Sequence, residues 1–157
     1  MLTSWLTGAW LTRQRLTVYP RMILSTDGDL EVIKTARAVN DGQVERAAEA
    51  IAATLGSLDG TTIAVLGLTY REGVRELAHA RGPLMADALR ARGATVLGHD
   101  PLLSADDIAG LKMTPWDGTA NAQVRAAVVA TADAAYRTMD FAALFPGLEV
   151  LVDGRNA

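Results

Sequence analysis

The alternation of short apolar runs with helix-like segments after residue 60 constrains the fold of this chain most strongly. Four strands are predicted, each short and apolar, at 62–66, 94–98, 125–131 and 149–152. Helical patterns separate them at 83–92, 104–107 and 138–145. Strands that alternate with helices are typical of right-handed crossovers between parallel strands. We therefore predict an α/β fold, a Rossmann-like open parallel sheet with helices on both faces.

A long helix is predicted ahead of this unit, over residues 29–55. Apolar residues recur there at mostly three- and four-residue steps, at Leu30, Ile33, Ala36, Val39, Ala47, Ile51 and Leu55. Asp27 or Asp29 is expected to cap its start and Gly56 to end it, and the Asn-Asp-Gly sequence at 40–42 predicts a bend or break. Such a helix has more apolar surface than one domain needs. It is either a core helix or a docking helix, and in the second case we expect self-association.

Composition limits the classes of function. The net charge of the 157 residues is −3, so there is no basic field to hold nucleic acid or an anionic membrane. The chain has no cysteine, hence no disulfide, thiolate metal site or cysteine nucleophile, and we expect a cytoplasmic protein. The segment 1–15 begins with a largely apolar part, but Arg13 and Arg15 follow this part, whereas in a signal peptide the positive charges precede it. The apolar part is also too short to span a bilayer. We interpret 1–15 as an unassigned segment that packs on the rest or is poorly ordered.

The candidate ligand site lies at the carboxyl ends of the predicted strands, where open parallel sheets bind ligands. Gly67 is followed by Leu68, Thr69, Tyr70 and Arg71, and Arg155 follows the glycine after the last strand. Arginine suits bidentate contact with phosphate or carboxylate, and a tyrosine ring can lie against a base or sugar. A nucleotide fits this set, but a core tyrosine and surface arginines fit it too. The loop lacks the second and third glycines of a dinucleotide fingerprint, so we do not expect NAD at this sheet.

Catalytic and metal-ligating residues are not evident. His79 and His99 are widely spaced and are interpreted as a loop and a turn residue. Asp100 is either a ribose ligand or, more simply, a turn residue. The Asp106-Asp107 pair is interpreted as helix-start charge, and the Arg75-Glu76 pair as a local ion pair. We therefore predict no catalytic residue and no metal site.

Several motifs together resemble the UDP-glucose/GDP-mannose dehydrogenase family, and most closely its UDP-N-acetylmannosamine dehydrogenase branch. Family members carry a Gly-Leu-(Thr/Ala)-(Phe/Tyr)-(Lys/Arg) turn, a Val-(Arg/Lys)-Glu and an Asp-Pro, which correspond here to 67–71, 74–76 and 100–101. The closing "VDGRN" at 152–156 also matches. The likeness extends from about residue 16 to the end. It implies a remnant of the central region with a long linking or dimer helix at 16–57, and a UDP-sugar-binding domain at 58–157.

The resemblance assigns functions to the candidate residues. Gly67, Leu68, Thr69, Tyr70, Arg71 and Arg155 are expected to bind the nucleotide sugar, and UDP or a UDP-sugar is the expected ligand. The reaction implied for the intact family is an NAD-dependent, two-step oxidation of a sugar C6 alcohol to a carboxylate, through a thiohemiacetal on cysteine. In this chain Arg15 occupies the cysteine position, and the NAD domain that would precede residue 1 is expected to be missing. We therefore expect that this chain alone binds no NAD and is inactive.

Three hypotheses follow from the resemblance to the family and from the differences at its catalytic positions. The chain is the UDP-sugar-binding part of a split or truncated dehydrogenase, whose partner is another copy or a chain that carries the missing NAD domain. Alternatively, it is a non-catalytic nucleotide-sugar-binding or docking module. In the third hypothesis it is an unrelated α/β module with surface arginines.

Overall fold

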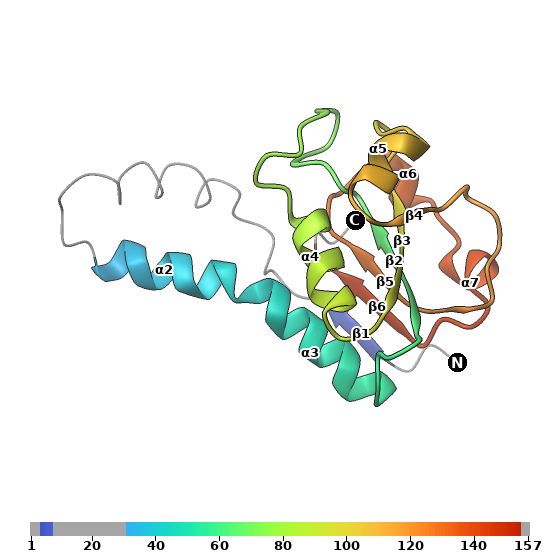
Figure 1. The fold of residues 1–157 in the computed structure, drawn as a ribbon, viewed down its shortest axis with the longest axis horizontal. Helices are drawn as coiled ribbons and strands as arrows, with labels where there is room; N and C mark the ends of the chain where they lie inside the picture. Colours follow the sequence, from blue (N-terminus) through green and yellow to red (C-terminus); the bar gives the residue numbers. More distant parts are fainter. Residues whose placement is uncertain (1–3, 8–30, 155–157) are drawn as a thin grey trace.

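A parallel sheet forms the centre of the computed structural model, which describes residues 4–7 and 31–154 (Figure 1). Within these ranges the sheet has six strands in the order β1-β6-β5-β2-β3-β4, and every neighbouring pair is parallel. The strands are β1 (Ser4–Thr7), β2 (Thr62–Leu66), β3 (Thr95–His99), β4 (Thr114–Pro115), β5 (Val124–Val129) and β6 (Val150–Asp153). The four predicted strands are confirmed within one or two residues at each end. The sequence analysis missed β1 and β4 because both are very short edge strands.

Helices cover both faces of the sheet, as predicted (Figure 1). The described helices are α2 (Glu31–Asp41), α3 (Gln43–Leu55), α4 (Arg81–Arg90), α5 (Ala105–Gly110), α6 (Ala134–Arg137) and α7 (Phe141–Leu144). In β2, Ile63 and Val65 join a core cluster with α3, α4 and α5, while Leu66 joins a second cluster on the opposite face with Tyr136 and Phe145. This alternation along one strand places a separate apolar core on each side of the sheet.

The long helix is interrupted at Gly42, within the predicted Asn-Asp-Gly break, and ends at Gly56, which has a φ of +85°. The second half, α3, buries Val44, Ala47, Ala48 and Ile51 against the sheet and is a core helix. The first half, α2, extends away from the sheet and leaves Val32 83% exposed (Figure 1). The core interpretation is thus confirmed for α3, and docking or self-association through α2 stays a prediction. The expected cap at Asp27 or Asp29 lies outside the described residues.

The segment after β5 differs from the sequence-based expectation. The helix predicted at 138–145 is present but shorter, as α7 at Phe141–Leu144, and the separate short helix α6 just before it was not predicted. Asp133 accepts a hydrogen bond from the Ala135 N–H and starts α6, and Asp140 accepts one from the Ala143 N–H and starts α7. Each aspartate begins a new helix, which divides the segment. At the amino terminus, β1 pairs with β6, in agreement with the packing alternative for that segment.

Candidate functional site

The carboxyl ends of β2 and β5 define the switch point of the sheet, because β2 continues to α4 on one face and β5 continues to α6 on the other. Gly67 follows β2 with a φ of +82°, and a Cβ atom on it would lie 2.6 Å from the backbone N and O of Thr131. The Thr131 hydroxyl donates a 2.6 Å hydrogen bond to the Thr69 carbonyl. The chain itself therefore fills the crevice at the switch point, and only glycine fits at position 67.

The buried carboxylate of Asp100 organises the start of the β2–α4 loop (residues 67–80). Its Oδ2 atom accepts hydrogen bonds from the backbone N–H of Leu68 (2.7 Å) and from both the backbone N–H and the hydroxyl of Thr69 (2.9 Å each). Its Oδ1 atom accepts one from the Leu102 N–H at 2.9 Å. Asp100 is thus a turn residue, as the simpler interpretation had it, and its oxygens are engaged by the protein.

Tyr136 connects the end of β2 to the end of β3 from the face of the sheet that α6 and α7 cover. Its hydroxyl accepts a hydrogen bond from the Gly67 N–H at 3.0 Å, donates one to the His99 carbonyl at 2.9 Å, and lies 3.0 Å from His99 Nδ1. Burial, with a smaller effect of the Asp100 charge, raises the pKa of Tyr136, so the hydroxyl stays protonated. Sequence reasoning missed Tyr136. The signal was a tyrosine in the first turn of a helix that begins directly after a buried strand.

His99 is not a turn residue, which corrects the prediction. It is the last residue of β3, and its ring lies edge-on to Trp116, with ring centroids 5.5 Å apart. Burial lowers the pKa of His99 below 6.5, and the charges of Asp100 and Asp133 oppose that effect. His79, in contrast, is an exposed residue of the β2–α4 loop, as predicted.

The predicted site residues of the loop divide into two groups. Gly67, Leu68 and Thr69 are buried and shape the turn. Tyr70 is half-buried and Arg71 is exposed, so these two side chains are accessible to a ligand. A small hairpin follows, closed by hydrogen bonds from the Tyr70 N–H to the Glu76 carbonyl (2.7 Å) and from the Val74 N–H to the Arg71 carbonyl (3.2 Å). Arg155 lies outside the described residues.

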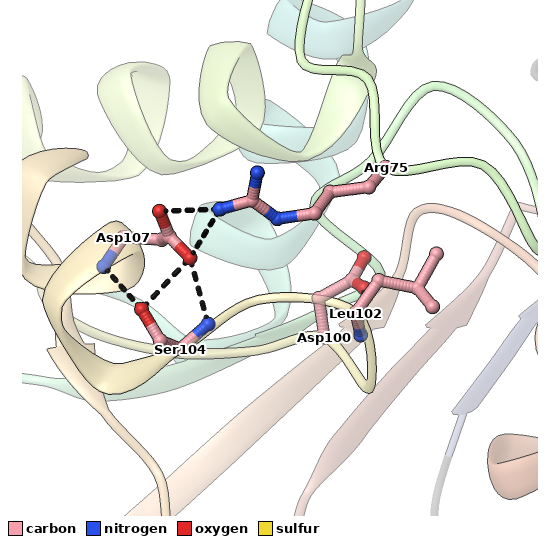
Figure 2. Close-up of polar contacts among 5 residues, drawn as sticks. All are labelled: Arg75, Asp100, Leu102, Ser104 and Asp107. Atoms are coloured by element: carbon pink, nitrogen blue, oxygen red, sulfur yellow. Dashed lines mark hydrogen bonds and ion pairs between the residues drawn. The ribbon is translucent and has the colours of Figure 1, made fainter.

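Two ion pairs connect this hairpin to neighbouring helices. Arg75 Nη2 lies 2.9 and 2.8 Å from the two carboxylate oxygens of Asp107 in α5, as Figure 2 shows. Nη2 of Arg137 in α6 lies 3.3 Å from Oε2 of Glu72. The predicted pairing of Arg75 with Glu76 is wrong, because the hairpin turns the Arg75 side chain toward α5.

Asp107 belongs to a capping box with Ser104, which confirms its predicted place at a helix start. Its Oδ2 atom accepts hydrogen bonds from the backbone N–H and the hydroxyl of Ser104, each at 2.8 Å. These bonds, with those from the Arg75 guanidinium, lower the pKa of Asp107 to about 2. The carboxylate is therefore ionised and fixed in orientation at neutral pH.

A cavity of about 190 Å³ opens at the carboxyl ends of β5 and β6. Its walls are Val129, Tyr136, Arg137, Met139, Phe141, Leu151 and Asp153.

In the described part of the chain, no group of three or more His, Cys, Asp or Glu side chains is placed to hold a metal ion. None of the helices described here has the length and apolar character that a membrane crossing requires. The site thus offers an exposed arginine, a half-buried tyrosine ring and a rigid backbone turn.

A parallel sheet with helices on both faces and polar groups at the carboxyl ends of its strands defines the class of Rossmann-like α/β domains. Comparison with known proteins narrows this class. The model of the UDP-glucose/GDP-mannose dehydrogenase family, UDP binding domain, matches residues 64–157. The chain belongs to this family.

Relatives and solved structures agree with this assignment. The chain is 31% identical over 141 residues to the UDP-glucose 6-dehydrogenase of Rhizobium meliloti, covering 83% of this chain and 31% of that protein. A UDP-glucose dehydrogenase of Pyrobaculum islandicum superposes with a TM-score of 0.72 at 28% identity, over 87% of this chain and 32% of that one. The UDP-D-ManNAc dehydrogenase of Pyrococcus horikoshii shares the fold, with a TM-score of 0.64 at 21% identity, over 89% of this chain and 34% of that one. The chain thus spans about a third of the length of these proteins.

Proposed function

We propose that this chain binds the UDP part of a nucleotide sugar at the Tyr70–Arg71 end of the β2–α4 loop, with Arg155 as a further contact. The family match over 64–157 and the exposure of Arg71 beside the half-buried Tyr70 support the proposal. A guanidinium presents paired donors to phosphate oxygens, and a ring edge or face suits a base or ribose. Gly67, Leu68 and Thr69 act by fixing the backbone from which the two side chains project.

The proposed domain organisation follows from this site. Residues 58–157 form the UDP-sugar-binding domain, residues 16–57 are a remnant of the central region with the linking helix, and residues 1–15 stay unassigned. Exposed Val32 and Val39 on α2 support the proposal of a second copy, or a chain with an NAD-binding domain, as the partner. We place the protein in the cytoplasm, where nucleotide sugars of this kind are used.

The oxidation itself is proposed to lie outside this chain. The family resemblance assigns the covalent step to a cysteine and the hydride to NAD, and none of the 157 residues is a cysteine. The β2–α4 loop also carries Thr69 and Glu72 where the second and third glycines of a dinucleotide fingerprint would lie. We therefore propose that the chain by itself binds no NAD and oxidises no sugar.

The absence of a thiol also supports a second candidate, a nucleotide-sugar-binding module without any catalytic partner. A mixture of the chain with UDP-glucose or UDP-N-acetylmannosamine, NAD and a lysate of the source cells separates the two candidates. NADH formation that depends on this chain favours the split dehydrogenase, and equal NADH formation with and without it favours the non-catalytic module.

Calorimetric titration with UDP and, separately, with NAD tests the site. We expect UDP to bind and NAD not to bind. Arg71→Ala should weaken UDP binding by about 1.5–3 kcal/mol, the range for a charge-assisted contact. Arg125→Ala is the matched control, because Arg125 is paired with Glu149 at the opposite, amino-terminal edge of the sheet. Equal UDP affinity of Arg71→Ala and the wild type would move the site elsewhere.

A further inference from the structure

The hairpin formed by residues 70–76 has a fixed shape but little packing of its own. Internal backbone hydrogen bonds close it, yet Arg71, Glu72 and Gly73 at its tip are exposed, and Val74 is only half-buried. Apolar burial therefore does not determine where the hairpin lies relative to the sheet. Its position depends on the contacts that connect it to better-packed elements.

Arg75 makes such a contact with a carboxylate that is itself held in place. Asp107 is locked by the capping box with Ser104, and the next residue, Ile108, is buried in the core. The guanidinium of Arg75 therefore meets an acceptor of fixed position and orientation (Figure 2). An ion pair costs less side-chain entropy when one of its partners is already ordered.

The segment 100–107 thus contacts the β2–α4 loop on both sides of Tyr70 and Arg71, the proposed ligand-binding residues. Asp100 accepts the backbone N–H groups of Leu68 and Thr69, just before Tyr70, and Asp107 holds Arg75, just after the hairpin turn. Asp100 also accepts the Leu102 N–H, which begins the turn that leads to Ser104 and α5 (Figure 2). Tyr70 and Arg71 lie between these two points of attachment.

We propose that Arg75 is a positioning residue for the nucleoside diphosphate: through Asp107 it holds the 70–76 hairpin in the orientation in which Tyr70 and Arg71 meet the ligand. This inference rests on the proposed function. Arg75 acts through the backbone of the hairpin and not by touching the ligand. Its side chain is 62% exposed, so the pair contributes little to global stability, and its effect appears as local order of the loop.

The test compares Arg75→Ala, Arg75→Lys and the wild type in the full chain, with UDP as the probe. Loss of an exposed ion pair should weaken UDP binding by about 2- to 5-fold and leave the midpoint of thermal unfolding nearly unchanged. Amide exchange at Tyr70, Val74 and Glu76 should become faster in Arg75→Ala. Arg75→Lys should restore both properties, because a single nitrogen of Arg75 makes both contacts with Asp107.

A double-mutant comparison ties the effect to Asp107. Adding Asp107→Asn to Arg75→Ala should weaken UDP binding no further, because the partner is already lost. Arg125→Ala, which breaks a comparable exposed pair at the far edge of the sheet, should change neither UDP affinity nor exchange of the hairpin.

The outcomes separate the two proposals. If the wild type binds UDP and Arg75→Ala binds it equally well with unchanged amide exchange, the positioning role is wrong and the proposed function stands. If the wild type binds no UDP, the proposed function fails, and the positioning role for a nucleoside diphosphate fails with it.

Discussion

Asp100 Oδ2 accepts hydrogen bonds from both the backbone N–H and the hydroxyl of Thr69, each 2.9 Å long. These residues lie at the ends of neighbouring strands, so the two bonds join the loop after β3 to the loop after β2. A buried carboxylate that accepts several N–H and O–H bonds is a strong local constraint, because it cannot lose one partner without leaving charge unsatisfied. The backbone that carries Tyr70 and Arg71 is therefore set by Asp100.

Asp100→Asn should lower the free energy of unfolding by about 1.5–3 kcal/mol, the range for hydrogen bonds to a charged group. The amide nitrogen of asparagine replaces one acceptor oxygen, so at least one of the bonds from Leu68, Thr69 or Leu102 is lost. Urea unfolding measures the change. Asp106→Asn, on the exposed first turn of α5, is the control and should change stability by less than about 0.5 kcal/mol. Equal effects of the two substitutions would contradict this account.

Gly67→Ala and Gly73→Ala form a matched pair within one loop. Both glycines have positive φ, +82° and +71°, but a Cβ atom at Gly73 meets nothing within 4 Å. Gly73→Ala should therefore cost only the left-handed backbone strain, about 1–2 kcal/mol. Gly67→Ala should cost roughly 1–3 kcal/mol more, because its Cβ would overlap the backbone of Thr131. Chemical denaturation of both variants checks the order, and a Gly67→Ala variant as stable as Gly73→Ala would disprove the close approach.

His99 should make stability depend on pH. Burial lowers its pKa in the folded state, so the unfolded chain takes up the proton first as the pH falls below about 6.5. The contribution of neutral His99 is therefore fully present above pH 6.5 and is lost as the pH falls through the folded-state pKa. Urea unfolding of the wild type and His99→Gln at pH 7.5 and 5.5 tests this. We expect the advantage of the wild type to shrink at pH 5.5, and an advantage that stays constant would argue against a depressed pKa.

Asp107 should titrate well below a typical carboxyl group. Its pKa is lowered to about 2 by hydrogen bonds from Ser104 and Arg75, so the ion pair persists above pH 4 and is lost as the pH falls toward 2. The side-chain carboxyl ¹³C shift, followed by NMR as the pH is lowered from about 6 to below 2, reports this directly. Arg75→Ala should raise the midpoint, because one of the causes of the depression is removed. An unchanged midpoint in that variant would mean that Arg75 does not contact Asp107 in solution.

Local signals in the sequence were enough to predict the fold class and to propose a candidate site at the strand ends. Apolar runs of strand length, Ser104 as a helix cap and Gly56 as a helix end are all local signals, which act within a few residues along the chain. Local periodicity also predicted the break near Gly42. The strand ends directed attention to Tyr70 and Arg71 because parallel strands end at a common edge.

The tertiary structure alone decided how the site is built. The hydrogen bonds that Thr69 donates to Asp100 and Gly67 donates to Tyr136 join residues 31 and 69 positions apart, and Arg75 reaches Asp107 across 32 positions. No local pattern specifies such partners, because they depend on the order of strands in the sheet and on which face each connection takes. For the same reason the sequence does not show that His99 ends a strand beside Trp116 and Tyr136, or that Arg75 pairs with Asp107 and not with its neighbour Glu76.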